Sequence, residues 1–479
     1  MSHSPHILVV EDDDDISEYI LRIIQELDAN AQITVVTNRD EARQLLEDKN
    51  FYDLLSLDLT IPAFSGSSEK KIEYGNEILH YCNDVAPGLP ILILTASSTD
   101  DLVSDFLESS EKTDIWGEGQ KRSTVGHALK RRLDDYESKI KDIVQAIRNL
   151  HQVEVNKTSD GIAIPLQDDR LIRIFARRNN GTRCDISIIS GGLSGARVYR
   201  ICVYNNSGNV IHNVVAKIAD HTTISTEDEN YAAYISRLRP EITPRRIETT
   251  VFGAKDTAAV FYGLAVGHDT DFFGVATGDT IETNLSKNIR DLTDKWLEAS
   301  TEESKTIKDV RCLLLNNECA EALIKEYDLD WATGFEDQPL QAKWCYIHGD
   351  LNGKNILVNR EQSTATLIDY GDIKEGPATI DPVTLEFSLF FHPDAASISN
   401  WPSIEQARKW FDLEEYIKDC PIPQVIKFVR EWTRSVEAGR RERAASAYSY
   451  LLRQLKYTDT DKGLAIALLE GTRNLYATT

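Results

Sequence analysis

The stretch that most constrains the fold of this chain spans Tyr346–Asp372 and reads YIHGDLNGKNILVNREQSTATLIDYGD. It holds two short apolar runs, Ile356–Val358 and Ala365–Ile368, with turn-forming residues between them. Two such runs around a turn predict a β-hairpin. Polar side chains flank both runs, so we expect these side chains to gather around one spot at the ends of the hairpin.

Three of these polar side chains have the chemistry that phosphoryl transfer from a nucleotide needs. Asp350 lies two residues after His348, Asn355 follows five residues after Asp350, and Asp369 ends the second run. An amide oxygen and a carboxylate are hard ligands that suit Mg²⁺, and a second carboxylate can orient or deprotonate an attacking hydroxyl. The alternative is a plain hairpin with Asp and Asn in its turns. The fixed spacing of these residues favours the catalytic interpretation.

The pattern H-G-D-x-x-x-x-N followed by I-D resembles the catalytic core of the protein-kinase-like fold, in its aminoglycoside phosphotransferase and choline kinase branch. The resemblance implies an ATP-dependent phosphotransferase in which Asp350 is the catalytic base, His348 belongs to the catalytic motif, and Asn355 and Asp369 hold Mg²⁺. Protein kinases have a long segment after the residue that matches Asp369, where a peptide docks, and here that segment is short. The resemblance therefore favours a small molecule over a protein as the phosphate acceptor.

The amino-terminal part of the chain alternates between strand and helix patterns. Apolar runs at His6–Val10, Asp53–Leu57 and Leu89–Leu94 indicate strands, and the segments between them have helical periodicity. This alternation predicts a doubly wound parallel sheet, in which functional groups gather where the strands end. Four residues with acidic or hydroxyl side chains fall at those ends: Glu11, Asp12, Asp58 and Thr95.

The motifs V-V-E-D, then L-D-L-x-x-P-x-x-x-G, then L-T-A-S resemble a two-component response-regulator receiver domain over residues 1–124. The resemblance implies that Asp58 accepts a phosphoryl group from a sensor histidine kinase or another phosphodonor. It also implies that Glu11, Asp12, Asp58 and the Thr60 carbonyl hold Mg²⁺. The other interpretation is an inert doubly wound domain with acidic strand ends.

Two further residues of the receiver pattern act as its switch. The resemblance implies that the hydroxyl of Thr95 reorients towards the phosphoryl group. The family's Lys-Pro near the fifth strand is missing. Lys121 is the best candidate for the lysine that contacts the phosphate, and Lys112 is a poorer alternative. The loop after Gly66 is longer than is usual in the family, because Ser67–Tyr74 intervenes before Gly75.

Residues 125–152 are predicted to be a helical connector. Apolar side chains recur there in steps of four and three, at Leu129, Leu133, Tyr136, Ile140, Ile143, Ile147 and Leu150. This a/d repeat predicts a coiled coil between two chains, and therefore a homodimer through residues 129–150. Alternatively, one amphipathic helix packs on a neighbouring domain.

Residues 153–479 are predicted to form a two-lobed α+β domain. Strand patterns dominate an amino lobe of about 153–266, at Leu171–Ala176, Asp185–Ile189, Val198–Tyr204, Val214–Ile218 and Phe261–Val266. Helical periodicity dominates the lobe of about 267–479. The whole chain is therefore an α/β multidomain protein.

A glycine-rich turn precedes the strand Val198–Tyr204, and a later strand carries Lys217. Glycines let backbone N–H groups approach phosphate oxygens. The placement resembles the amino lobe of the kinase-like fold, which implies that the nucleotide phosphates are held by Gly191, Gly192, Ser194, Gly195 and Lys217. An acid on the next helix should pair with Lys217. Glu227 is the first candidate because it shares a face with apolar residues, and Glu229 is the second.

Composition excludes some classes of function. The net charge of −24 disfavours a nucleic-acid surface or an anionic membrane as partner. It is compatible with an acidic pocket for a cationic small molecule, although a solvated acidic surface explains it more simply. Seven scattered cysteines and the lack of a long apolar run predict a cytoplasmic protein. The rival to an enzyme is a non-catalytic nucleotide-binding scaffold that receiver phosphorylation switches.

Overall fold

The computed structural model describes residues 4–48, 50–96, 110–158, 163–191, 196–240, 242–263, 267–268, 270–395 and 401–478. The chain divides into two compact units. The first consists of Met1–Ser225 and Arg246–Leu264, and the second of Thr226–Arg245 and Ala265–Thr479. Across the described residues, every helix is too short or too polar to cross a bilayer.

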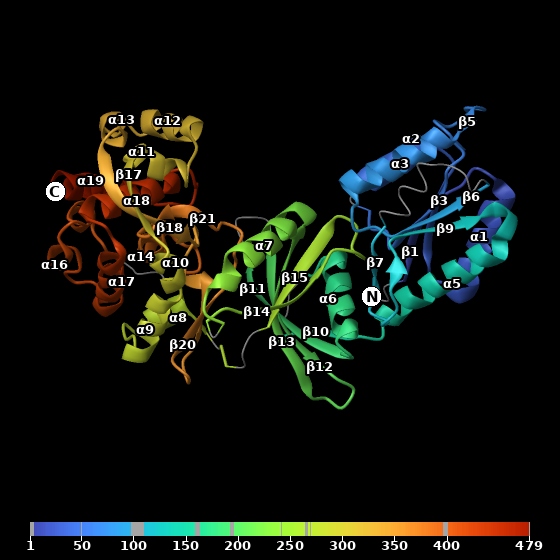
Figure 1. Ribbon diagram of the computed structural model, residues 1–479, viewed down its shortest axis with the longest axis horizontal. Coiled ribbons are helices and arrows are strands. Elements are labelled where there is room, and N and C mark those ends of the chain that lie inside the picture. The colour runs from blue at the N-terminus through green and yellow to red at the C-terminus, as the bar shows by residue number, and fades with distance from the viewer. Residues whose placement is uncertain are drawn as a thin grey trace. The chain divides into compact units, whose positions relative to one another are not determined.

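A five-stranded parallel sheet opens the first unit (Figure 1), in the order β2-β1-β3-β6-β9. Helices α1 and α5 pack on one face of this sheet, and α2 and α3 pack on the other. The predicted doubly wound fold is therefore confirmed. The bounds are β1 (His6–Val10), α1 (Asp14–Leu27), β2 (Gln32–Val36), α2 (Arg39–Glu47), β3 (Leu54–Asp58), α3 (Ile72–Val85), β6 (Ile91–Thr95), β9 (Val125–Leu129) and α5 (Leu133–Leu150).

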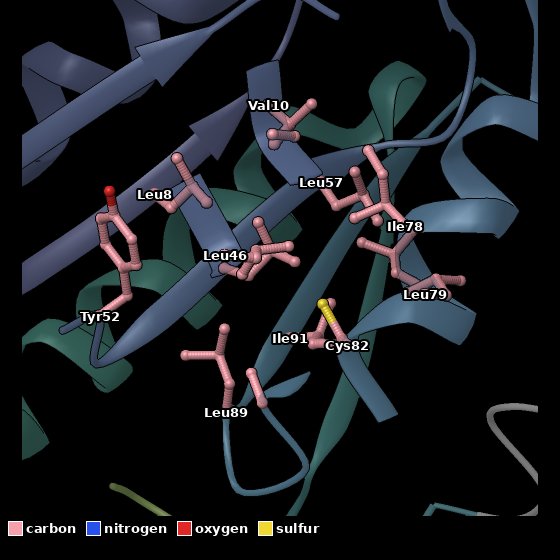
Figure 2. Packing of buried hydrophobic residues seen from close by; sticks show 14 of the residues in the cluster. Leu8, Val10, Leu46, Tyr52, Leu57, Ile78, Leu79, Cys82, Leu89 and Ile91 are labelled. Carbon is pink, nitrogen blue, oxygen red and sulfur yellow. The ribbon is translucent and has the colours of Figure 1, made fainter. Parts of the chain in front are cut away.

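Strand alternation divides the core of this domain into two layers. Leu8 and Val10 point to one face of the sheet, and Ile7 and Val9 point to the other. Figure 2 shows the first layer, where Leu8, Val10 and Leu57 of the strands lie beside side chains of α2 and α3. Two short hairpins lie outside the sheet and pair β4 (Ile61–Pro62) with β5 (Lys70–Lys71), and β7 (Lys112–Thr113) with β8 (Arg122–Ser123).

Helix α5 belongs to this domain, and the coiled-coil prediction for residues 129–150 is wrong. Tyr136, Ile140 and Val144 are fully buried in the second core layer, against strands and α1. The Tyr136 hydroxyl lies 2.6 Å from the Ser56 hydroxyl on β3. The heptad spacing therefore serves an amphipathic helix that packs within one chain, and its apolar face is not free to pair with a second copy.

The observed end of this domain differs from the predicted end for the same reason. The predicted connector begins with a strand, β9, which pairs in parallel with β6. Residues 125–150 complete the doubly wound sheet and its last helix, so the domain extends to residue 150 instead of 124. We call residues 4–150 the first domain.

Residues 151–225 and 246–263 of the first unit form the amino lobe, whose six-stranded sheet has the order β10-β11-β12-β13-β15-β14. The predicted strand at Leu171–Ala176 is wrong, because these residues lie in a helix, α6. The run LIRIFA is buried on every side of that helix, and its apolar pattern fits a buried strand as well as a buried helix. The bounds are β10 (Glu154–Lys157), α6 (Leu166–Arg178), β11 (Arg183–Gly191), β12 (Arg197–Tyr204), β13 (Val210–Asp220), β14 (Arg245–Thr250) and β15 (Thr257–Gly263).

Helix α6 joins the first domain to the amino lobe. One side packs on the lobe's sheet, where the ring of Phe175 stacks on Phe261 at 4.0 Å. The other side contributes Ile174 to an apolar cluster with Trp116 and with Ile147 of α5. On the same helix, Arg170 forms a fully buried ion pair with Asp53, with Nε and Oδ1 2.9 Å apart.

The second unit surrounds a hairpin with helices. Strands β19 (Ile356–Asn359) and β20 (Thr364–Leu367) pair antiparallel, which confirms the predicted hairpin, and β16 (Thr270–Asp271) extends it. A second sheet has the order β17-β18-β21, with β17 (Thr301–Thr306), β18 (Pro339–Ile347) and β21 (Lys374–Pro377).

The helices include α7 (His221–Ala233), which crosses from the first unit into the second. The others are α8 (Phe272–Ala276), α9 (Thr283–Asp291), α10 (Asp294–Glu298), α11 (Ile307–Cys312), α12 (Asn317–Glu326), α13 (Trp331–Glu336), α14 (Ile380–Phe391), α15 (Ile404–Arg408), α16 (Leu413–Tyr416), α17 (Pro423–Val436), α18 (Arg440–Gln454) and α19 (Lys462–Ala477).

The burial of α5 predicts the effect of a charge in its apolar face. Ile140→Asp places an unpaired carboxylate in a dry core, so the free energy of unfolding of the first domain should fall by more than about 3 kcal/mol. Urea denaturation measures this change. Ser138→Asp, at an exposed position of the same helix, is the control and should stay near the wild-type value. A soluble Ile140→Asp variant of wild-type stability would contradict the packing of α5.

Candidate functional site

Three carboxylates meet at the carboxyl ends of β1 and β3. Glu11 and Asp12 follow β1, Asp58 ends β3, and these strands are parallel neighbours, so their ends fall at one edge of the sheet. The three residues can each offer an oxygen within 4.8 Å of the others. Such a set of hard oxygen ligands fits a divalent cation such as Mg²⁺.

Lys130 lies in this acidic site, and Lys121 does not. The Lys130 ammonium donates to Glu11 Oε1 and to Asp58 Oδ2, each at 2.8 Å. Lys121 is exposed in the loop between β7 and β8. The sequence did not predict Lys130, because the predicted domain boundary at residue 124 lies before β9. The apolar side chains of Val125 and Leu129, four residues apart and so on one face of an extended strand, were the available signal for that strand.

Burial and charge set the protonation of this site. Burial raises the pKa of Glu11 to about 7, the charge of Asp58 adds to the rise, and Lys130 opposes it. Burial likewise raises the pKa of Asp58 against the effect of Lys130. For Lys130, burial lowers the pKa, but the hydrogen bonds to both carboxylates outweigh it and raise the pKa overall.

Three other residues border the acidic site. The Thr60 N–H donates to Asp58 Oδ1 at 3.2 Å. Thr95 ends β6 and is buried, at the strand end next to that of β3. Lys70, from the enlarged loop, reaches Asp12 at 2.5 Å. The switch position predicted for Thr95 therefore lies at the same edge of the sheet as Asp58.

In the second unit, the loop before the hairpin brings Asp350 and Asn355 together. The Asn355 side-chain N–H donates to the Asp350 carbonyl at 2.8 Å. The Ile368 N–H donates to the Asn355 carbonyl at 3.0 Å, so Asp369 directly follows a residue that is tied to this loop. These contacts tie the loop of Asp350 and Asn355 to the end of the second strand, where Asp369 follows.

A buried carboxylate on α14 fixes the same loop. Asp381 Oδ2 accepts from the His348 N–H at 2.8 Å, and Oδ1 accepts from the Gly349 N–H at 3.0 Å. Burial raises the pKa of Asp381, while the charge of His348 and the two N–H groups oppose the rise. Gly349 has a φ of 81°, and a side chain there would meet the Asp372 carbonyl, so the turn requires glycine.

His348 lies behind the site and serves to support it. Its ring is fully buried, and Nε2 lies 3.1 Å from the Ile368 carbonyl oxygen, next to Asp369. The predicted motif member therefore orients the two halves of the loop, and the partly exposed carboxylate of the motif is that of Asp350.

Helix α7 holds the segment around Asp369 from the other side. Glu227 is fully buried, as its face predicted, whereas Glu229 is exposed. Glu227 Oε1 accepts from the Tyr370 N–H at 3.2 Å. The Asn230 side chain donates to the Tyr370 carbonyl at 3.0 Å. Asp369 has a φ of 68°, a conformation that costs a non-glycine residue energy and that these contacts help to maintain.

The residues predicted to hold nucleotide phosphates are described only in part. Lys217 is buried on β13, where it pairs with Val198 of β12 and Val260 of β15. Gly191 ends β11 opposite Arg197. Gly192, Ser194 and Gly195 lie outside the described residues.

No sequence motif pointed to two residues that lie beside Asp350. Asn352 donates from its side chain to Asp350 Oδ2 at 3.1 Å. Arg453, on α18, lies 3.4 Å from Asp350 Oδ1. Asn352 lies within the motif at a position that the pattern leaves open, and Arg453 reaches the site only through the tertiary fold.

Comparison with known proteins gives two regions of similarity. Residues 287–400 match the phosphotransferase enzyme family, and this range includes Asp350, Asn355, Asp369 and Asp381. No curated protein matches the chain.

Solved structures resemble separate parts of the chain. A CheY-like receiver domain from Methanospirillum hungatei JF-1 is 17% identical over 30% of this chain and 98% of its own, with a TM-score of 0.22. The receiver domain of a DNA-binding response regulator from Colwellia psychrerythraea 34H is 22% identical over 30% of this chain and 99% of its own, with a TM-score of 0.22. An aminoglycoside-3'-phosphotransferase of type VIII is 16% identical over 64% of this chain and 99% of its own, with a TM-score of 0.30.

The anchor made by Asp381 yields a prediction. In Asp381→Asn the amide has one acceptor oxygen, and its NH₂ group faces one of the two loop N–H groups. The free energy of unfolding should fall by about 1–3 kcal/mol, and any phosphoryl transfer that depends on Asp350 should fall with it. Urea denaturation measures the first effect. Asp372→Asn, at an exposed acid, is the control. Wild-type stability in Asp381→Asn would contradict the anchoring role.

Proposed function

We propose that this protein is a response regulator whose output domain is an ATP-dependent phosphotransferase. The observation that carries the proposal is the arrangement around Asp350. This carboxylate is about one-third exposed, on a loop fixed from below by Asp381 and joined to Asn355. The match of residues 287–400 to the phosphotransferase enzyme family supports the same reaction.

In the proposed reaction, Asp350 takes the proton of an acceptor hydroxyl. The hydroxyl oxygen bonds to the γ-phosphorus of ATP while the bond to the β–γ bridging oxygen breaks, and ADP leaves. Asn355 and Asp369 would hold Mg²⁺, whose charge would offset that of the phosphate oxygens. An amide oxygen and a carboxylate are a donor set that suits this ion.

Two groups of residues would complete nucleotide binding. Lys217 would contact the phosphates, together with backbone N–H groups of the turn that contains Gly191, Gly192, Ser194 and Gly195. Glu227 would stabilise the charge of Lys217. Within the second unit, Glu227 also accepts from the Tyr370 N–H.

A small-molecule acceptor is supported by the segment that follows Asp369. Between this residue and α14 the chain forms one short strand, β21, which pairs at once with β18. No extended segment is left in these described residues on which a peptide could dock, as it does in protein kinases.

The catalytic assignment predicts different defects for two acids. Asp350→Asn removes the base, so transfer from ATP should fall by roughly 10²- to 10⁴-fold while ATP binding persists. Asp369→Ala removes a metal ligand, so Mg²⁺-dependent ATP binding should itself be lost. Calorimetry measures binding, and release of labelled phosphate into products measures transfer. Asp372→Ala is the matched control, because its acid is exposed three residues beyond Asp369.

The same measurements separate the enzyme from a nucleotide-binding scaffold. A wild-type protein that binds ATP but transfers no phosphate to water, metabolites or proteins would favour the scaffold. Equal transfer by wild type and Asp350→Asn would refute the proposed base.

We also propose that phosphorylation of Asp58, by a sensor histidine kinase or another phosphodonor, regulates this output. A phosphoryl group adds charge and acceptor oxygens. Lys130 already donates to Asp58, and it begins the short 3₁₀ turn Lys130–Arg132 that leads into α5. A change at Asp58 would therefore act on the first turn of this helix.

The far end of α5 meets the amino lobe. Ile147 and Leu150 pack against Ile174 of α6, and α6 packs on the sheet that carries Lys217. The buried Arg170–Asp53 pair adds a second link, and Asp53 immediately precedes β3, the strand that ends in Asp58. Direct packing inside the first unit thus offers a route from Asp58 to the amino lobe without a second chain.

This route predicts a labelling and an activity result. Acetyl phosphate with Mg²⁺ should label wild type but not Asp58→Asn or Asp12→Ala. Labelling should change the rate of phosphoryl transfer from ATP. Lys130→Met should remain open to labelling, but its transfer rate should no longer respond, because the link from Asp58 to α5 is gone.

Lys121→Met is the matched control, since Lys121 is exposed in the loop between β7 and β8. Its transfer rate should respond to acetyl phosphate as wild type does. Labelling that survives Asp58→Asn would show a different acceptor, and a normal response in Lys130→Met would exclude the route through α5.

A further inference from the structure

Arg453 is a charged side chain beside Asp350 that the proposed reaction has not yet used. It lies on α18, outside the matched range 287–400, and its Nη2 is 3.4 Å from Asp350 Oδ1. Its side chain is 18% exposed. The guanidinium therefore reaches the base from the carboxyl-terminal helices and stays in partial contact with solvent.

Within the described part of the chain, most N–H groups of the Arg453 guanidinium lack a strong hydrogen-bond partner. The guanidinium has five N–H groups. Its contact with Asp350 is long for a charged pair, and its Nε is buried without a hydrogen-bond partner among the described residues. The ring of Tyr450, 5.3 Å away, supports the guanidinium but accepts no hydrogen bond in the plane of the fork. A guanidinium with so few strong partners can form further hydrogen bonds to an anion that binds beside Asp350.

Asp350 does not depend on Arg453 for its position. Its other oxygen accepts from the Asn352 side chain, and its carbonyl accepts from Asn355. The next cation along the loop, Lys354, is already paired with Asp271 at 3.0 Å. Among the described residues near Asp350, Arg453 is thus the cation that remains available to bind another molecule.

We propose that Arg453 determines acceptor specificity by binding an anionic group, a carboxylate or a phosphate, on the alcohol that Asp350 activates. This inference rests on the proposed phosphotransferase function. The planar fork of arginine matches both anions. Because Arg453 touches the base, the anion and the reacting hydroxyl must be close together on the acceptor. A cationic acceptor would meet the guanidinium charge at short range and be disfavoured.

The reaction keeps this anion unchanged. The acceptor hydroxyl gives its proton to Asp350 and its oxygen bonds to the γ-phosphorus, as the bond from that phosphorus to the bridging oxygen of ADP breaks. Arg453 holds the neighbouring anion throughout, so its removal should weaken acceptor binding more than ATP binding.

The test uses the full-length protein, γ-labelled ATP and a metabolite extract that ion exchange has separated into cationic, neutral and anionic pools. Wild type should label a product in the anionic pool. Arg453→Gln should lower kcat/KM for that acceptor by about 10- to 100-fold, chiefly through KM, with the KM for ATP unchanged. Arg453→Lys keeps the charge and should recover part of the loss. Arg434→Gln, at an exposed arginine of α17, should behave as wild type.

Prior treatment of the anionic pool with a phosphatase distinguishes the two anions, because a phosphate-bearing acceptor is destroyed and a carboxylate-bearing acceptor survives. A product in the cationic or neutral pool would overturn the inference while leaving the phosphotransferase function intact. An anionic product whose kcat/KM is the same in wild type, Arg453→Gln and Arg453→Lys would also overturn it. Failure of wild type to label any pool would instead remove the phosphotransferase function on which the inference rests.

Discussion

The loop that carries the proposed base depends on one buried carboxylate of the second unit. Asp381 accepts the N–H groups of His348 and Gly349, and it thereby fixes a loop whose next residue is the proposed base. A buried carboxylate is costly unless it is paired or well bonded, and here two backbone donors offset part of that cost. The consequence is a rigid backbone beneath Asp350, to which Asn355 and the hairpin are then tied. Positioning of this kind is what phosphoryl transfer needs from a protein, because it requires little covalent chemistry from the side chains.

In the first unit, the packing of the first domain against the amino lobe depends on one helix. Helix α6 covers the amino-lobe sheet on one side and meets α5 and the start of β3 on the other. Its pair Arg170–Asp53 is fully buried, and loss of either partner from such a pair costs about 3–5 kcal/mol. Lys255 strengthens the same junction, since its ammonium donates to the carbonyls of Asp48 and Asn50. The first domain and the amino lobe therefore pack against each other within the first unit.

Sequence patterns predicted the parts of the fold that local periodicity determines. The hairpin around Asn355, the parallel sheet that ends in Asp58 and the inward face of Glu227 all follow from residues close together in the chain. The errors arose where tertiary packing decides between two local patterns. The heptad spacing around Ile140 suits a coiled coil and an amphipathic helix equally, and the run at Leu171–Ala176 suits a buried strand and a buried helix. Arg453 could not be predicted, because only the folded chain brings it to Asp350.

The burial of α6 also bears on how such a protein can change over evolutionary time. Nine consecutive residues, Asp168 to Ala176, are buried in this helix, so substitutions on either side must suit a partner that is already in place. Two domains joined by a flexible linker can be exchanged freely, because neither surface has to fit the other. Here the two surfaces share a core. The first domain and the amino lobe should therefore be inherited together and should accumulate paired changes, and a chimera that exchanges the first domain alone would have a mismatched interior.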